Sequence, residues 1–321
     1  MKGYILPNEK LWTGRSSEQK LYLHEAVNFI DLNSNRQYDH EKAFGLIAYA
    51  CDEGVRRNLG RPGAATAPDI IKAQLGKLTN HLPEPFSLLD LGSISCIDGD
   101  MEAAQEHLGT AVGDLLENNI FPIVLGGGHD IAYGHYGGIK NHLKESETLG
   151  IINFDAHFDL RDNKSGNNSG TPFFQIAEDC KWEQRPFHYQ CLGIRKEAND
   201  KGLFSTAKKF GVKYTEVDEF TIHNLEQVRE ELTSFMDKVD RIYVTIDLDG
   251  FSSAYAPGVS ASSPMGFSPD IVLETLKTII SSEKLISIDV AELNPQFDID
   301  HQTAKLAASL VHFVMHKVAL L

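Results

Sequence analysis

"IINFDAHFDLR", residues 151–161, joins an apolar run to Asp155, His157 and Asp159, which are spaced two residues apart. In an extended chain, side chains at positions i, i+2 and i+4 lie on the same face. Two carboxylates and an imidazole that are buried together without a partner lose their hydration, and the carboxylates repel each other. The stretch therefore predicts a buried strand whose end presents polar side chains either to solvent or to a cation.

Short apolar runs alternate with helix-patterned stretches along most of the chain. Eight runs are predicted as strands, at residues 44–50, 86–92, 121–126, 149–155, 187–194, 212–217, 241–248 and 285–293. Seven stretches are predicted as helices, at residues 68–80, 99–118, 130–145, 197–210, 222–238, 269–282 and 301–319. This alternation is typical of an α/β fold with a parallel sheet covered by helices. Because no repeat or linker divides the chain, we predict an N-terminal arm (residues 1–43) and a single α/β domain (residues 44–321).

The composition excludes several classes of partner. The 321 residues include 30 Lys and Arg against 45 Asp and Glu, a net charge of −15, which repels phosphate-rich partners, so we expect no nucleic acid ligand. No apolar run is long enough to cross a bilayer, and the N-terminus has no signal-like segment, so we expect a cytoplasmic protein without a membrane partner. The four cysteines form no C-x-x-C pair, which indicates a reduced compartment and structural thiols at Cys51, Cys96, Cys180 and Cys191.

Three further predicted strands end in polar groups. The strand at 121–126 is followed by His129 in the sequence GGGHD, the strand at 241–248 ends in Asp247 and Asp249, and the strand at 285–293 ends in Glu292. In a parallel sheet the carboxyl ends of all strands lie at the same edge, which is where open α/β sheets bind ligands. We therefore expect these groups and the end of the 149–155 strand to converge on one site.

The candidate ligands at this edge are two histidines and four aspartates: His129, Asp155, His157, Asp159, Asp247 and Asp249. Carboxylates favour Mg, Ca or Mn, imidazole admits Mn, Fe, Zn or Ni, and no cysteine lies near these motifs. Six ligands are too many for one catalytic zinc, but they suit two divalent ions about 3.5–4 Å apart, and four aspartates balance their charge. Each Asp-x-Asp motif alone is typical of a solvated turn, and the glycine triplet lacks the pattern of a phosphate loop. The set together predicts a binuclear metal site.

These motifs resemble those of the ureohydrolase superfamily, which contains arginases, agmatinases and formimidoylglutamases. The resemblance rests on GGGHD (126–130), NFDAHFDLR (153–161), TIDLDGF (245–251) with the following Ala-Pro-Gly, and IDVAELNP (288–295), and it extends from about residue 44 to the end of the chain. It implies a three-layer arginase-like fold with an eight-stranded parallel sheet and two Mn²⁺ ions per chain. It also implies that Asp155 and Asp247 bridge the ions, with His129 and Asp159 completing one site and His157 and Asp249 the other. Family members are often trimers or hexamers, so a homo-oligomer is compatible with the resemblance.

The substrate is predicted from positions at which this sequence differs from arginases. Arg161 stands where arginases have an asparagine, and Ser169 stands where they have a histidine. An arginine favours a substrate with an extra carboxylate, because its guanidinium can pair with a carboxylate through two hydrogen bonds. DAHFDLR, SGTPF and GVRRNLGRPGA are similar to formimidoylglutamase sequences, which implies hydrolysis of N-formimidoyl-L-glutamate to L-glutamate and formamide in histidine degradation. On this interpretation Arg161, Ser169 and Glu292 contact the substrate.

The resemblance also implies a mechanism, attack of a metal-bridging hydroxide on the amidine carbon. Asp159 would accept the proton of the hydroxide and pass it to the leaving amine, and Glu292 would accept hydrogen bonds from the formimidoyl nitrogens. Three alternatives remain open: an agmatinase or guanidino-acid hydrolase that releases urea, a catalytically silent metal-binding relative, and a single-zinc deacetylase of the same fold. Arg161 could also face solvent or pair with Asp162 or Glu292.

Overall fold

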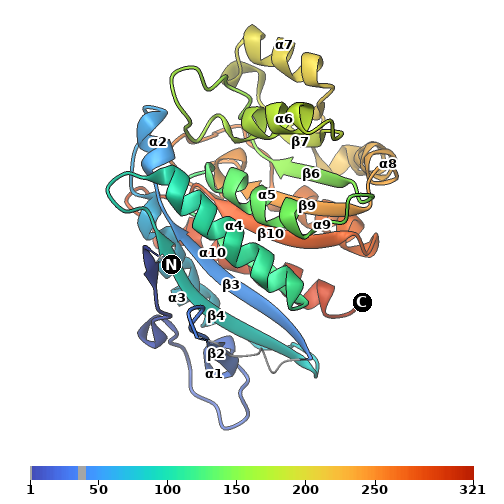
Figure 1. The fold of residues 1–321 in the computed structure, drawn as a ribbon. Coiled ribbons are helices and arrows are strands. Elements are labelled where there is room, and N and C mark those ends of the chain that lie inside the picture. The colour runs from blue at the N-terminus through green and yellow to red at the C-terminus, as the bar shows by residue number, and fades with distance from the viewer. Residues whose placement is uncertain (1, 35–40) are drawn as a thin grey trace.

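Within residues 2–34 and 41–321, which the computed structural model of the chain describes, a ten-stranded sheet forms the centre of the molecule (Figure 1). The strands are β1 (Tyr4–Ile5), β2 (Val27–Phe29), β3 (Lys42–Ala50), β4 (Phe86–Ser95), β5 (Ile120–Leu125), β6 (Leu149–Phe154), β7 (His188–Ile194), β8 (Lys213–Glu216), β9 (Arg241–Asp247) and β10 (Leu285–Ala291). Their order is β1-β4-β3-β5-β10-β9-β6-β7-β8, and β2 also pairs with β4.

The eight predicted strands correspond to β3 through β10, and every pairing among them is parallel, so the prediction of an eight-stranded parallel sheet is confirmed for this part. The N-terminal segment adds the antiparallel β1 and the parallel β2 to β4. These two strands are only two and three residues long and have no periodic pattern of their own. The division into an arm at 1–43 and a domain at 44–321 stays a prediction.

The helices are α1 (Leu23–Ala26), α2 (Glu53–Arg57), α3 (Ala67–Leu75), α4 (Met101–Glu117), α5 (Ile131–His142), α6 (Pro172–Trp182), α7 (Lys201–Phe210), α8 (Leu225–Met236), α9 (Pro269–Ser281) and α10 (Gln302–Val318). The seven predicted helices are all present, as α3 to α5 and α7 to α10. Helix α6 was not predicted from the sequence; it begins at Pro172, directly after a glycine- and asparagine-rich loop. Proline suits the first turn of a helix because the N–H group that it lacks would have no hydrogen-bond partner there.

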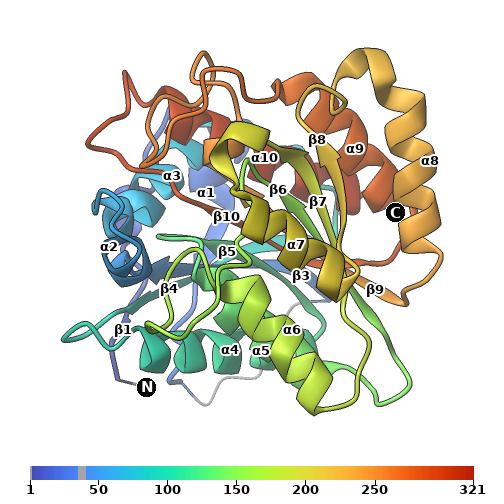
Figure 2. The ribbon, with the colours of Figure 1, turned by 90° about the horizontal axis from the view of Figure 1, so that it is seen from above.

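The helices cover both faces of the sheet, so the expected three layers are present. Figure 2 shows α4, α5 and α6 on one face and α3, α9 and α10 on the other. Successive strand residues alternate between the two cores: Leu46 and Ile123 pack with the layer that contains α9 and α10, whereas Ile47 and Val124 pack with the layer that contains α4 and α5. Since both faces are buried, these strands are continuous apolar runs.

Four neighbouring strands, β5, β10, β9 and β6, place their carboxyl ends side by side. Leu125 of β5 is in register with Val290 of β10, and Ala291 is in register with Asp247 of β9. The residues that follow these positions therefore meet at one edge of the sheet, as the sequence predicts. This edge carries the candidate site.

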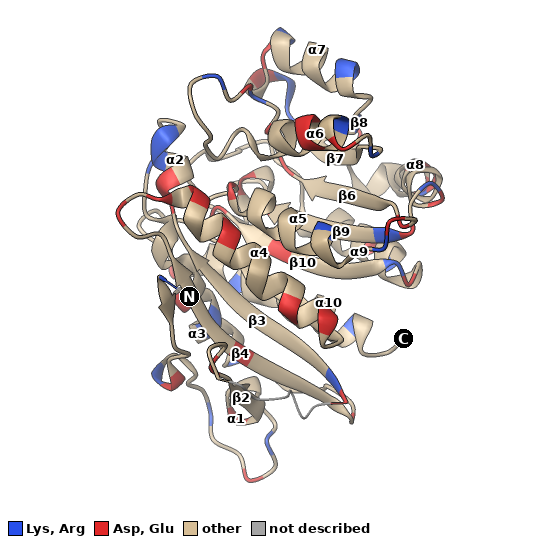
Figure 3. Ribbon diagram, viewed as in Figure 1, with Lys and Arg blue, Asp and Glu red and all other residues tan. Residues whose placement is uncertain are grey.

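Few Lys, Arg, Asp and Glu residues of the described part of the chain are buried. Figure 3 shows acidic residues recurring along α4, in keeping with the net charge of −15. In the described part of the chain, no helix combines the length and the apolar character that crossing a bilayer requires.

Candidate metal centre

The glycine triplet after β5 brings the chain against β3 and places His129 at the sheet edge. The N–H groups of Gly127 and Gly128 donate to the carbonyl oxygens of Tyr49 and Cys51, both at 2.9 Å. A Cβ atom at residue 127 would lie 1.8 Å from the Cys51 carbonyl oxygen, so only glycine fits there. The triplet thus serves the close approach of two backbone segments beside a candidate ligand.

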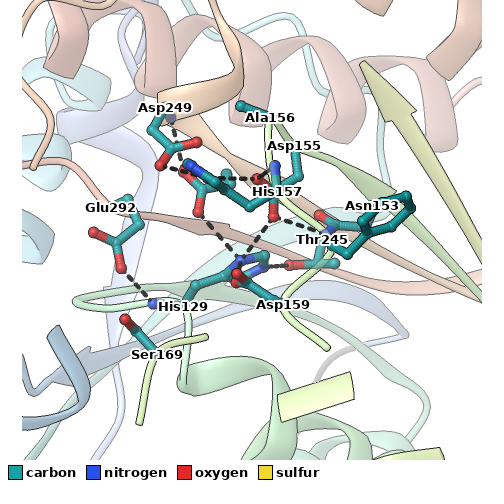
Figure 4. A network of polar contacts seen from close by, with 12 residues as sticks. His129, Asn153, Asp155, Ala156, His157, Asp159, Ser169, Thr245, Asp249 and Glu292 are labelled. Atoms are coloured by element: carbon teal, nitrogen blue, oxygen red, sulfur yellow. Dashed lines mark hydrogen bonds and ion pairs between the residues drawn. The ribbon is translucent and has the colours of Figure 1, made fainter. Parts of the chain in front are cut away.

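His129 is surrounded by three carboxylates (Figure 4). Its Nδ1 atom lies 2.9 Å from Asp159 Oδ2, 3.2 Å from Asp155 Oδ2 and 3.2 Å from Asp247 Oδ2. One ligand atom from each of the four residues lies within 4.8 Å of the others, which is close enough for all four to hold one ion. Three different strand ends contribute to this group.

A second group consists of Asp155, His157 and Asp249, again with ligand atoms within 4.8 Å of one another. His157 Nδ1 lies 3.2 Å from Asp249 Oδ2 and 3.5 Å from Asp155 Oδ1. The two groups share Asp155, so its carboxylate can contact two ions at once. All six predicted metal ligands are therefore brought together, although Asp247 belongs to the first group only.

The same local turn follows β6 and β9. The carboxylate of Asp155 accepts a hydrogen bond from the N–H of His157 at 2.7 Å, and that of Asp247 accepts one from the N–H of Asp249, also at 2.7 Å. An aspartate that binds the backbone two residues ahead makes such a turn on its own. The Asp-x-His and Asp-x-Asp spacings therefore turn the chain and direct two side chains to the same edge.

The electrostatics of the group reflect crowded, buried carboxylates. Burial and the neighbouring carboxylates Asp249 and Asp155 raise the pKa of Asp247 well above its usual range, and burial with the charge of Asp155 raises the pKa of Asp159. Burial opposes protonation of His129, but its hydrogen bonds to three aspartates outweigh this and raise its pKa. In the metal-free protein the cluster therefore retains protons.

The donor set fits two divalent cations. Asp249 Oδ1 is buried and has no hydrogen-bond partner among the described residues, which leaves a carboxylate oxygen available for a cation. Buried anionic oxygens are strongly disfavoured unless they are paired or bound to a metal. Four aspartates, one of which is shared by the two groups, and two histidines match the charge and ligand number of a pair of divalent ions.

A buried network behind His129 fixes its ring. The Nε2 atom lies 2.9 Å from Thr245 Oγ1, whose hydroxyl donates to Asp289 Oδ1 at 2.5 Å. Asp289 also accepts from the hydroxyl of Tyr243 and contacts His135 Nδ1 at 2.7 Å. Because the Thr245 proton goes to Asp289, Nε2 of His129 donates to Thr245 and keeps its proton, so Nδ1 is the nitrogen that can lose its proton and bind a cation. These residues were not predicted from the sequence, although Thr245 shares a strand face with Asp247.

Asn199 holds the loop that carries His157 and was also missed. Its Oδ1 atom accepts from the N–H of Phe158 at 3.0 Å, and its Nδ2 atom donates to the carbonyl of Ala156 at 2.9 Å. One side chain thus satisfies backbone groups on both sides of His157. No local sequence signal links Asn199 to this loop, since the contact spans about forty residues.

Glu292 lies directly after β10 and is buried beside the cluster. Its Oε1 atom accepts a hydrogen bond from the N–H of His129 at 2.8 Å, and its backbone has φ 68°, in the left-handed region. Burial and the negative charge of Asp249 raise the pKa of Glu292 to about 8. A carboxylate held in this way can accept hydrogen bonds from a ligand above the cluster.

A cavity of about 190 Å³ opens above the cluster. It is lined by Val55, Asn58, Gly60, His129, His157, Asp159, Arg161, Ser169, Asn199, Leu203, Asp247, Asp249, Ser260, Ala261 and Glu292. Arg161 is the only Lys or Arg among these residues, and it is exposed. Its guanidinium makes no hydrogen bond or ion pair with any described residue, so the alternative pairing with Asp162 or Glu292 is wrong. Ser169 is buried, with its hydroxyl 3.2 Å from Asn58 Nδ2.

The chain is similar in sequence and fold to several known proteins. A profile of the arginase family matches residues 42–316. A formimidoylglutamase of Geobacillus sp. (strain WCH70) is 42% identical over 319 residues, covering 97% of each chain. The crystal structure of a Bacillus subtilis formimidoylglutamase is similar with a TM-score of 0.83 and 25% identity, covering 96% of this chain and 95% of that one. A Trypanosoma cruzi formiminoglutamase solved with Mn²⁺ is similar in fold, with a TM-score of 0.76, 21% identity and coverage of 89% and 96%. The chain belongs to the arginase family.

Proposed function

We propose that this protein is a formimidoylglutamase, a binuclear-metal hydrolase that cleaves N-formimidoyl-L-glutamate to L-glutamate and formamide. The observation that carries the proposal is the unpaired guanidinium of Arg161 in the cavity above the two groups of metal ligands. The substrate has an amidine at one end and two carboxylates, so it needs both an acidic floor and a cationic group. The curated relative from Geobacillus supports the same activity.

Two Mn²⁺ ions are the proposed cofactor. His129 and Asp159 would complete one site, His157 and Asp249 the other, and Asp155 and Asp247 would serve both. When bound, the ions would acidify a water molecule and stabilise the negative charge that develops on the oxygen and nitrogen atoms around the attacked carbon. The choice of manganese is supported by the family resemblance, and the oxygen-rich ligand set is compatible with it.

Asp159 and Glu292 are the proposed catalytic residues. Asp159 has a side chain that is 12% exposed and lines the cavity, so it can reach both the ligand cluster and a substrate nitrogen. It would accept the proton of the attacking water and deliver it to the leaving nitrogen. Glu292, held by the N–H of His129, would accept hydrogen bonds from the amidine and orient its carbon toward the cluster.

In addition to Glu292, the proposed substrate-binding residues are Arg161 and Ser169. The guanidinium would pair with a carboxylate, whereas agmatine, a cation without a carboxylate, would be repelled. A guanidino-acid hydrolase remains the second candidate, because 4-guanidinobutyrate also carries a carboxylate. The second group of ligands argues against a single-zinc deacetylase, and the complete set of six argues against a silent relative.

Product analysis tests the proposal. Manganese-loaded protein is incubated in parallel with N-formimidoyl-L-glutamate, L-arginine, agmatine and 4-guanidinobutyrate, and formamide, glutamate and urea are quantified. Formamide and glutamate from the first substrate, with little urea from the others, is the expected result. Urea from a guanidine with no formamide would overturn the proposed substrate and favour the guanidino-acid or agmatine alternative.

Cytoplasmic location, assembly into a homo-oligomer and the absence of nucleic acid and membrane partners stay predictions.

A further inference from the structure

Arg161 lies across Gly170, and the side chain of Asn58 lies beside it. A Cβ atom at residue 170 would be 2.9 Å from Arg161 Cδ, 3.2 Å from Arg161 Nε and 3.2 Å from Asn58 Nδ2. The nitrogen atoms of two side chains thus flank one point in space. A side chain at residue 170 would press on both of them.

Both side chains have hydrogen-bond donors without acceptors. One hydrogen of Asn58 Nδ2 goes to Ser169 Oγ at 3.2 Å, while the other has no acceptor among the described residues. The guanidinium of Arg161 is entirely unpaired within the same part of the chain. Asn58 is half-buried and both residues line the cavity. Unpaired donors that converge in a cavity are the usual form of a site for a carboxylate.

Three contacts hold Asn58 in place relative to Arg161. Asn58 directly follows α2, and the loop after Arg161 is fastened to that helix by the N–H of Ser169, which donates to the carbonyl of Gly54 at 3.1 Å. Arg57 Nη1 donates to the carbonyl of Asn167 at 3.3 Å. The third contact is the Asn58–Ser169 hydrogen bond itself. The backbone N–H of Arg161 also donates to Gly170 at 2.9 Å, so both donors are attached to one framework.

We propose that Asn58 and Arg161 together bind the side-chain carboxylate of the substrate, with Gly170 keeping them adjacent. This proposal rests on the proposed function. If Glu292 orients the amidine, the α-carboxylate of N-formimidoyl-L-glutamate lies close to the cluster, because only one carbon separates it from the reacting nitrogen. Arg161 is exposed at the opening, so the carboxylate it meets is the distant one. The guanidinium would donate hydrogen bonds to one or both carboxylate oxygens, and the free N–H of Asn58 would donate to a remaining lone pair.

Two substrates separate this subsite from the rest of the cavity: N-formimidoyl-L-glutamate, and N-formimidoyl-L-norvaline, in which a methyl group replaces the side-chain carboxylate. For Asn58→Ala, kcat/KM for the glutamate derivative is expected to fall about 10- to 100-fold, the usual loss of a hydrogen bond to a charged group. The value for the norvaline derivative should change less than about three-fold, because that substrate makes no contact there. Asn163→Ala removes an asparagine from the loop after Arg161, outside the cavity, and should leave both values unchanged.

Two more variants keep the test independent of folding. Asn58→Asp keeps the size of the side chain but places a negative charge beside Arg161, so it should lower kcat/KM for the glutamate derivative more than Asn58→Ala does. Gly170→Ala should displace Arg161 and raise KM for the glutamate derivative alone. Melting temperature and manganese content identify any variant that has lost the fold or the metals.

The outcomes distinguish the two proposals. If the wild-type protein releases formamide from neither substrate, the proposed function fails. If it prefers the glutamate derivative but the variants of Asn58 and Gly170 preserve that preference, the proposed function stands and the subsite is overturned. Equal losses for both substrates would likewise overturn it, because a disturbed cavity affects substrates with and without the carboxylate.

Discussion

The carboxylate of Glu292 accepts a hydrogen bond from the backbone N–H of His129 at 2.8 Å, across 163 positions of sequence. Glu292 follows β10 and His129 follows β5, and these strands are neighbours in the sheet. The same contact therefore positions the residue proposed to orient the substrate and a proposed metal ligand. A change that preserves this contact but alters the charge of Glu292 separates the two roles.

Glu292→Gln is such a change. The amide oxygen can still accept from the N–H of His129, so we expect two manganese ions per chain and a similar melting temperature. The negative charge is lost, and kcat should fall by about 100-fold or more, as when a preorganised charged partner is removed from a reacting group. Metal content by mass spectrometry and steady-state kinetics check this, with the exposed Glu117→Gln as the control. Full activity in Glu292→Gln would remove Glu292 from the mechanism.

Arg161→Ala tests the cationic group of the cavity. If the guanidinium holds a carboxylate equally in the ground and transition states, KM should rise about 100-fold while kcat stays within about three-fold. Arg15 is also exposed, without a partner among the described residues and outside the cavity, so Arg15→Ala matches the change of charge. An unchanged KM in Arg161→Ala would contradict the proposed role of Arg161 in substrate binding. Arg161→Lys should recover only part of the loss, because an ammonium cannot form the paired hydrogen bonds.

The central sheet and the ligand cluster could be predicted because their signals are local. The buried parallel strands are continuous apolar runs, and a spacing of two residues places Asp155 and His157 on a strand end. The parallel arrangement then brings distant motifs to one edge without further information. The prediction of six converging residues needed only strand ends and their direction.

Other parts of the site depend on contacts that no local pattern encodes. Thr245 and Asp289 stand on different strands, and only the register of β9 and β10 makes them partners. Asn58 is recognisable as a site residue only once α2 is placed against the loop after Arg161. The helix α6 was missed because a loop rich in Gly and Asn precedes it, and β1 and β2 are too short to show a period.

The network behind His129 predicts a difference between two substitutions of Thr245. Thr245→Val removes the hydroxyl, leaving both Nε2–H of His129 and one oxygen of Asp289 without their partner. Manganese affinity should weaken about 10- to 100-fold, the usual cost of losing such a supporting contact. Thr245→Ser keeps the hydroxyl and should retain the affinity of the wild-type protein. Titration against a fluorescent chelator measures both. Equal affinities in the Val and Ser variants would show that the hydroxyl does not support the ligand.

The pKa shifts predict how pH affects the metal-free protein. Burial and the charge of Asp249 raise the pKa of Glu292 from an ordinary value of 4.5 to about 8. A raised pKa contributes stability that is fully present below the unfolded value and is lost as pH rises through the folded value. From about pH 6 upward, this group alone should lower the free energy of unfolding by about 1.4 kcal/mol per pH unit, until the pH approaches its folded pKa. The raised pKa values of Asp247, Asp159 and His129 act in the same direction.

Bound manganese should reverse this trend, because the ligands must be deprotonated to bind and fewer protons compete as pH rises. The gap in melting temperature between manganese-loaded and chelator-treated protein is therefore expected to widen from about pH 6 to about pH 8. Asp155, whose hydrogen bonds to His129 and His157 overcome burial and lower its pKa, stays ionised across this window and adds no slope. In metal-free Glu292→Gln the melting temperature should fall less steeply with pH, since glutamine does not titrate. A metal-free melting temperature that is level or rises over this range would contradict the proposed origin of the pKa shifts.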